Sequence, residues 1–126
     1  MSSSANTTAA EIAIAVTQGA MTAQAVTEAA LTRVATHNDR LNCFTTVLAD
    51  AALAQARAVD RAIAAGQSPG PLAGVPFAVK DLFDIEGVVT RAGSTINQDN
   101  SPAAQDATAV ARLKAAGAIL IGALNM

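Results

Sequence analysis

A lysine ends a short apolar segment that turn-forming residues enclose. The segment is PLAGVPFAVKD, residues 71–81. If its apolar part is a strand, alternate side chains share a face, so Lys80 lies on the face of Ala78 and opposite Phe77. Asp81 then points to the other face and need not pair with Lys80. An amine that looks across small residues suits the lining of a cavity, where it can act as a base. The alternative is a lysine that ends the strand in solvent.

Three nucleotide-binding patterns with related letters do not fit this chain. FAVK is similar to the VAIK strand of protein kinases, but a kinase needs a G-x-G-x-x-G loop upstream. The glycines at 66, 70 and 74 are instead spaced by four and follow alanine-rich helices. A P-loop would need Gly-Lys-Ser/Thr, and GAILIGALN lacks the three glycines of a dinucleotide site.

Other reactive side chains have structural interpretations. A nitrilase-type Glu-Lys-Cys triad needs its cysteine after the lysine, whereas Cys43 precedes it. Since free cysteine usually behaves as a small hydrophobe, we expect a packed or half-buried thiol. The lone histidine, His37, complements the dipole of a helix C-terminus. Asp81, Asp84 and Glu86 are expected in a turn or at the surface, so the sequence predicts no metal site and no cofactor.

Three helices are predicted before the lysine segment. TTAAEIAIAVTQG carries a capping box of Thr8 and Glu11 and a stop at Gly19. A second helix starts on Thr22. A third covers about 50–65, with small apolar residues repeating on one face.

The second half of the chain predicts a strand, a helix and another strand. Residues 75–80 form the first strand, and a polar loop at about 84–105 is too long to be a simple connection. Asp106 caps a helix that ends at Ala116. Residues 118–124 are almost all apolar, as in a strand buried on both faces. This order is a βαβ crossover, so we predict an α/β layer fold.

Composition narrows the classes of function. The chain has 126 residues, 52% hydrophobic and 14% charged, with net charge −2. This length fits one domain or part of a larger one. Three phenylalanines, no Trp or Tyr, and a negative charge argue against nucleic-acid binding. The first basic residue is Arg33, so the start of the chain lacks the positive region of a secretory signal. No apolar run approaches the roughly 20 residues of a membrane helix. The single cysteine cannot form an internal disulfide. We expect a cytoplasmic protein that does not contact membranes.

Two long segments resemble the N-terminal section of the amidase signature enzymes. They are GPLAGVPFAVKDLFDIEGVVTRAGS and DATAVARLKAAGAILIGALNM, and the resemblance extends back to LTRVATHNDRLNCFTTV. It therefore covers nearly the whole chain, in the family's order and approximate spacing. It implies the mixed-sheet fold of that family and a Ser-cisSer-Lys triad whose lysine is Lys80.

The implied mechanism makes a demand on Lys80. In the family a nucleophilic serine attacks an amide carbonyl, and a second serine on a cis peptide bond relays its proton to an uncharged lysine. A free lysine is cationic at neutral pH, so this role requires burial beside apolar groups and away from carboxylates. Phe77 and Phe83 are candidates to exclude water there.

The resemblance also implies that the chain is incomplete. Both family serines, and the oxyanion hole around the nucleophile, belong to a glycine- and serine-rich segment further along. We expect residues 1–126 to be the N-terminal part of a single amidase signature domain, helical over about 1–66 and opening the α/β core over 67–126. Ser94, in RAGS, is expected to be a turn residue and no substitute. We therefore expect no amidase activity from these residues alone.

The resemblance suggests a substrate class and a partner. LFDIEGV, AGSTIN and RLKAAGAILIGALNM are most similar to enzymes that hydrolyse 1-carboxybiuret, a small linear amide, and also to the A subunit of glutamyl-tRNA amidotransferases. Relatives of both kinds work beside a small helical subunit, so such a partner is expected, and a homo-oligomer is compatible with the sequence. A different class stays open: a short, non-catalytic interaction module that uses its alanine-rich helices.

Overall fold

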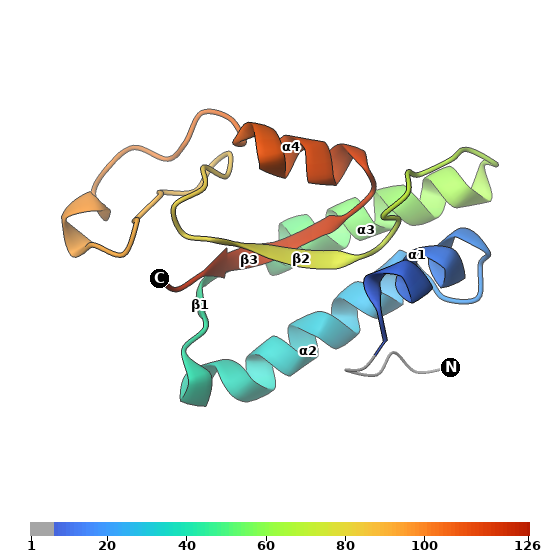
Figure 1. The fold of residues 1–126 in the computed structure, drawn as a ribbon, viewed down its shortest axis with the longest axis horizontal. Helices are drawn as coiled ribbons and strands as arrows, with labels where there is room; N and C mark the ends of the chain where they lie inside the picture. Colours follow the sequence, from blue (N-terminus) through green and yellow to red (C-terminus); the bar gives the residue numbers. More distant parts are fainter. Residues whose placement is uncertain (1–6) are drawn as a thin grey trace.

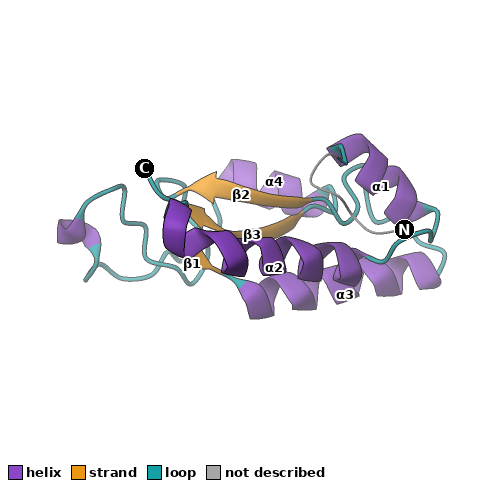
Figure 2. Ribbon diagram, turned by 90° about the horizontal axis from the view of Figure 1, so that it is seen from below, coloured by secondary structure: helices purple, strands orange, loops and turns teal. Residues whose placement is uncertain are grey.

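The computed structural model describes residues 7–126 as a layered α/β structure. Its elements, in chain order, are α1 (Ala9–Thr17), α2 (Ala23–Leu41), β1 (Phe44–Val47), α3 (Ala49–Ala64), β2 (Pro76–Lys80), the 3₁₀ helix η1 (Thr95–Asn97), α4 (Thr108–Ala115) and β3 (Ile119–Leu124). Figures 1 and 2 show α1, α2 and α3 on one face of the sheet and α4 on the other. The predicted fold class, helices followed by a βαβ unit, is confirmed.

The sheet has the strand order β1-β3-β2. β2 and β3 are parallel and α4 connects them, as the sequence predicts. β1 pairs with the other edge of β3 in the antiparallel sense. The first five residues of β3 are buried, because β3 has a strand on each side and helices on each face.

The strand β1 is not predicted from the sequence. Its four residues, Phe-Thr-Thr-Val, lie between two helices within the part expected to be helical. α2 ends at Leu41. Its C-cap, Asn42, takes the left-handed conformation (φ 52°), and the chain then turns back toward β3. Asn38 holds this turn, because its Oδ1 accepts from the Phe44 N–H at 2.8 Å. Threonine and valine favour strands, so the sequence Thr-Thr-Val was the signal from which this strand could have been predicted.

The sheet separates two hydrophobic cores. The core on the helical face holds Ile119 and Ile121 of β3 with Ala78 of β2 packed against it. The core on the α4 face holds Leu120, with Phe77 packed against it. The alternation predicted for β2 is therefore confirmed. Lys80 is the last residue of this strand, as predicted.

The start of α2 is fastened to α3. Thr22 caps the helix through its side chain, which accepts from the Ala25 N–H at 3.0 Å. Asp60 of α3 adds a second cap: its two carboxylate oxygens accept from the N–H groups of Ala23 at 2.7 Å and Gln24 at 3.1 Å. Negative charge is favourable at a helix N-terminus, so Asp60 both caps α2 and fixes the packing of the two helices.

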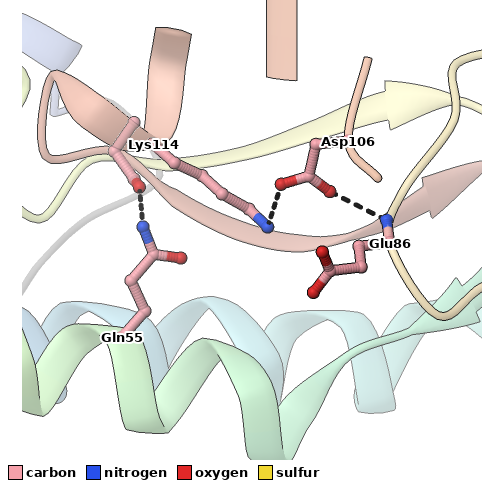
Figure 3. A network of polar contacts seen from close by, with 5 residues as sticks. Gln55, Glu86, Asp106 and Lys114 are labelled. Carbon is pink, nitrogen blue, oxygen red and sulfur yellow. Dashed lines mark hydrogen bonds and ion pairs between the residues drawn. The ribbon is translucent and has the colours of Figure 1, made fainter. Parts of the chain in front are cut away.

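The predicted cap of α4 is wrong. The helix starts at Thr108 with Ala107 in the capping position and without a side-chain cap. The Asp106 carboxylate instead accepts from the Glu86 N–H and from the Lys114 amine, both at 2.8 Å. Figure 3 shows this carboxylate between the two donors. Asp106 therefore ties the long loop to the last turn of α4, and the sequence could not show this because the partners lie 20 and 8 residues away.

This link should make part of the stability depend on pH. Burial opposes ionisation of Asp106, but the hydrogen bonds from Lys114 and Glu86 and the Lys114 charge together lower the pKa of the carboxyl below its usual value. Because the pKa is lower in the folded state, ionised Asp106 stabilises the fold at pH values above the unfolded pKa of about 3.9. This stabilisation is lost as pH falls through the pKa of the folded state. Asp106→Asn should therefore lower the free energy of unfolding by roughly 0.5 kcal/mol at pH 6.

Urea denaturation of both proteins between pH 6 and the acid limit measures this effect. The difference between wild type and Asp106→Asn should shrink as pH falls below about 4, because the protonated acid resembles the amide. Lys114→Met should reproduce most of the difference at pH 6. A difference that stays constant down to about pH 2.5 would contradict the assignment.

Candidate active site

Lys80 is the last residue of β2, at the carboxyl end of the two parallel strands. Its Cα is in register with Leu124 of β3. In open α/β sheets, ligands bind outside the carboxyl ends of the strands. Figure 1 shows the long loop after β2 projecting from this end, with the C-terminus beside it. The lysine singled out in the sequence therefore stands where α/β folds place their sites.

The surroundings of Lys80 are open within the described residues. Its side chain is exposed, and the only ion pair among residues 7–126 joins Lys114 to Asp106, so Lys80 pairs with no carboxylate there. Phe83, a candidate to exclude water, is 40% exposed, and Phe77 packs into the core on the α4 face. These residues alone do not give Lys80 the dry setting that a base requires, so its role stays a prediction.

Asp81 lies in the turn that follows β2, as expected, but it is buried and not at the surface. It is 4% exposed. Its Oδ2 accepts from the Thr45 hydroxyl at 2.9 Å and its Oδ1 from the Arg91 N–H at 3.0 Å. Its carboxylate forms no ion pair with Lys80. The sequence missed its burial because Thr45 lies 36 residues away, on a strand that was not predicted.

The backbone around Asp81 is held just as closely. The Asp81 N–H donates to the Leu124 carbonyl at 2.9 Å, and its carbonyl accepts from the Ala92 N–H at 2.7 Å. The Phe83 N–H donates to the Lys80 carbonyl at 3.1 Å, which closes a turn directly after β2. The end of β2 is thus joined to β3 and to the far side of the loop.

The long loop has its own internal structure. A parallel bridge links Glu86 to Ala103, with the Gly87 N–H donating to the Ala103 carbonyl at 2.9 Å. Ile85 is buried at 4% exposure in the core on the α4 face. Asp84 and Glu86 are exposed, as expected. The loop is therefore an ordered part of the fold at the carboxyl end of the sheet.

A small polar cavity of about 160 Å³ lies between this loop and the end of the sheet. Its lining includes Thr45, Asp81, Arg91, Ser94, Thr95 and Asn125. Ser94 caps the 3₁₀ helix η1, because its Oγ accepts from the Ile96 N–H at 3.3 Å, so its predicted role in a turn is confirmed. Lys80 is not among the residues that line this cavity.

A larger cavity of about 360 Å³ lies between α2 and the helical face of the sheet. Cys43 and His37 line it together with mainly apolar residues. The expected packing of Cys43 is wrong: the thiol is exposed, and its nearest polar contact is the Leu41 carbonyl at 3.8 Å. The chain turns at Asn42 so that Phe44, and not Cys43, packs toward the core. Neither reactive group has a partner among the described residues that would make it a catalytic centre.

Two features of other protein classes are absent from residues 7–126. No three side chains of His, Cys, Asp or Glu come together there in a way that could hold a metal ion. None of the helices in this range combines the length and apolar character needed to cross a lipid bilayer.

Comparison with known proteins identifies the family. Residues 25–126 match the Amidase family. The chain is 48% identical over 116 residues to AtzE, a component of the 1-carboxybiuret hydrolase of Pseudomonas sp. strain ADP, covering 92% of this chain and 25% of that protein. It is 46% identical over 119 residues to the A subunit of the glutamyl-tRNA(Gln) amidotransferase of Streptomyces coelicolor, covering 94% and 24%.

A solved structure agrees with these relatives. The native peptide amidase from Stenotrophomonas maltophilia superposes with a TM-score of 0.88 at 34% identity, covering 97% of this chain and 25% of that one. The chain thus spans about a quarter of the length of the relatives it matches. The family match nevertheless includes most of α2, the strands β1, β2 and β3 and the whole lysine segment, and the chain belongs to the amidase signature family.

Proposed function

We propose that this chain is the N-terminal part of an amidohydrolase that cleaves the C–N bond of a small linear amide, with Lys80 as the base of a Ser-cisSer-Lys triad. The observation that carries the proposal is the position of Lys80, at the carboxyl end of β2 within the stretch that matches the family. The ordered loop and the polar cavity beside this end supply a framework for a site.

The chemistry follows from a shared proton path. A serine hydroxyl attacks the amide carbonyl. A second serine relays the proton of this hydroxyl to the uncharged Lys80 amine. The amine later returns a proton to the leaving nitrogen as the C–N bond breaks. Both serines and the oxyanion hole would come from the three quarters of the relatives' length that this chain does not span. That same part would cover the exposed Lys80 and exclude water from it, and burial of this kind favours the uncharged amine.

Two substrate classes follow from the relatives. A biuret- or urea-type amide is favoured by the 48% identity to a component of a 1-carboxybiuret hydrolase. Glutamine, with transfer of its ammonia to a misacylated tRNA, is the alternative, favoured by 46% identity to an amidotransferase component. Both relatives are named as subunits, so we also propose a partner subunit for the whole protein, together with a cytoplasmic location.

Ammonia release by the protein translated from the complete reading frame tests the function. Biuret-type amides should give steady ammonia release. Glutamine with misacylated glutamyl-tRNA should instead give glutamate, with the ammonia transferred to the tRNA, only if the alternative is right. Residues 1–126 alone should release none, because they lack the nucleophile. Absence of hydrolysis with every amide tested, in the presence and absence of a co-expressed partner, would overturn the proposal.

A further inference from the structure

We propose that Asp81 is a positioning residue for Lys80: its buried carboxylate joins the end of β2 to β1 and to the long loop, and so fixes the point from which the amine acts. This inference rests on the proposed role of Lys80. It concerns a residue that does not itself touch the reacting atoms.

The burial of Asp81 calls for a reason. Asp81 and Thr27 are the two buried polar residues among those described. A buried carboxylate is costly unless it is paired or hydrogen-bonded, and within residues 7–126 no cation pairs with Asp81. Both of its oxygens are instead satisfied by neutral donors, the Thr45 hydroxyl and the Arg91 N–H. Such hydrogen bonds to a charged acceptor are stronger than neutral ones.

These bonds connect three segments that are remote in the sequence. Thr45 belongs to β1 and Arg91 to the far side of the loop, 36 and 10 residues from Asp81. The backbone of Asp81 adds bonds to Leu124 of β3 and Ala92. All four polar functions of this residue are therefore engaged, so the neighbouring Cα of Lys80 has little freedom to move.

A carboxylate suits this place because both partners of its side chain are donors. An asparagine presents one acceptor and one donor group, so one contact must adapt. The Thr45 hydroxyl can adapt, since the Ala123 carbonyl lies 3.4 Å away as another acceptor and its oxygen can then accept from the amide. Asp81→Asn should therefore keep the link among the three segments, whereas Asp81→Ala removes it.

Kinetics of the full-length enzyme on its amide substrate test the inference. A shift of about 1 Å in a catalytic group can cost on the order of 10²-fold in rate, so Asp81→Ala should lower kcat by about 10²-fold. KM should change by less than about threefold, because the inference gives Asp81 no contact with the substrate. Asp81→Asn should restore kcat to within about threefold of wild type. Asp84→Ala is the matched control: this exposed aspartate accepts from the Thr90 hydroxyl at 2.7 Å, and its loss should leave kcat unchanged.

A second variant keeps the test sound if Asp81→Ala folds poorly. Thr45→Val removes one bond to the carboxylate with little change in shape, and it should lower kcat about threefold to tenfold at an unchanged circular dichroism spectrum. If the role of Asp81 is purely structural, these variants should have a lower melting temperature and an unchanged kcat once folded. That result would overturn the inference. An equal loss of kcat in Asp81→Asn and Asp81→Ala would also overturn the inference. The negative charge of Asp81, and not its hydrogen bonds to the neighbouring segments, would then be the cause. Activity retained in Lys80→Met would instead refute the proposed function.

Discussion

Lys80→Met in the full-length protein is expected to lower kcat/KM for amide hydrolysis by about 10⁴-fold, the upper range for loss of a general base. Methionine keeps much of the length and the apolar stem of lysine and removes only the amine. Lys80 is exposed in the described residues and forms no ion pair there, so the change in the free energy of unfolding of the 126-residue chain should stay within about 0.5 kcal/mol. Ammonia release and urea denaturation measure the two quantities separately.

The chain offers one matched control, because Lys114 is its only other lysine. Its amine pairs with Asp106 at 2.8 Å, whereas Lys80 forms no ion pair among the described residues. Lys114→Met should cost roughly 0.5 kcal/mol of stability and less than about twofold in activity. The two variants thus have opposite profiles. A Lys80→Met enzyme with more than a tenth of wild-type activity would exclude this lysine as the base.

The helices and the βαβ unit could be predicted because their signals are local. The capping box of α1 is formed as expected: Thr8 accepts from the Glu11 N–H at 3.1 Å, and Glu11 accepts from the Thr8 N–H at 3.0 Å. The apolar run before Met126 became a central strand, since such a run can be buried only between two layers. The place of Lys80 on β2 followed from the same local pattern.

The features that the sequence did not reveal depend on distant partners. Asp106 seemed a helix cap from its position alone, yet its donors are Glu86 and Lys114. Asp81 seemed a surface residue because nothing near it in the sequence shows the hydroxyl of Thr45 beside it. Such polar residues do not recur at regular intervals in the sequence, so no pattern predicts their partners. The partners can be identified only once the three-dimensional arrangement of the strands and loops is known. The dry setting of Lys80 is of the same nature, and stays a prediction for the whole protein.

Gly122→Ala is expected to be the most destabilising small substitution in the sheet, with a loss of about 3 kcal/mol or more in the free energy of unfolding. Gly122 lies in β3 between β1 and β2, in register with Val47 and Ala78. A Cβ atom there would overlap the backbone carbonyl of Thr46 and lie 2.9 Å from the Phe44 ring. The carbonyl belongs to the neighbouring strand, so it can move away only if β1 separates from β3. Urea denaturation followed by circular dichroism measures the loss, because the chain has no Trp or Tyr for fluorescence.

Two comparisons show whether the backbone contact is the cause. Gly66→Ala adds the same methyl group where no atom lies within 4 Å, so only its left-handed conformation (φ +78°) opposes it, at a cost of about 1 kcal/mol. Adding Phe44→Ala to Gly122→Ala should recover little, because shortening the ring leaves the Thr46 carbonyl in place. A full recovery would mean that the ring was the obstacle, and a loss no larger than that of Gly66→Ala would mean that β1 is not held against β3. In the second case Thr45 would not be fixed beside Asp81 by the pairing of β1 with β3. The sheet and the proposed positioning of Lys80 therefore depend on the same close approach at Gly122.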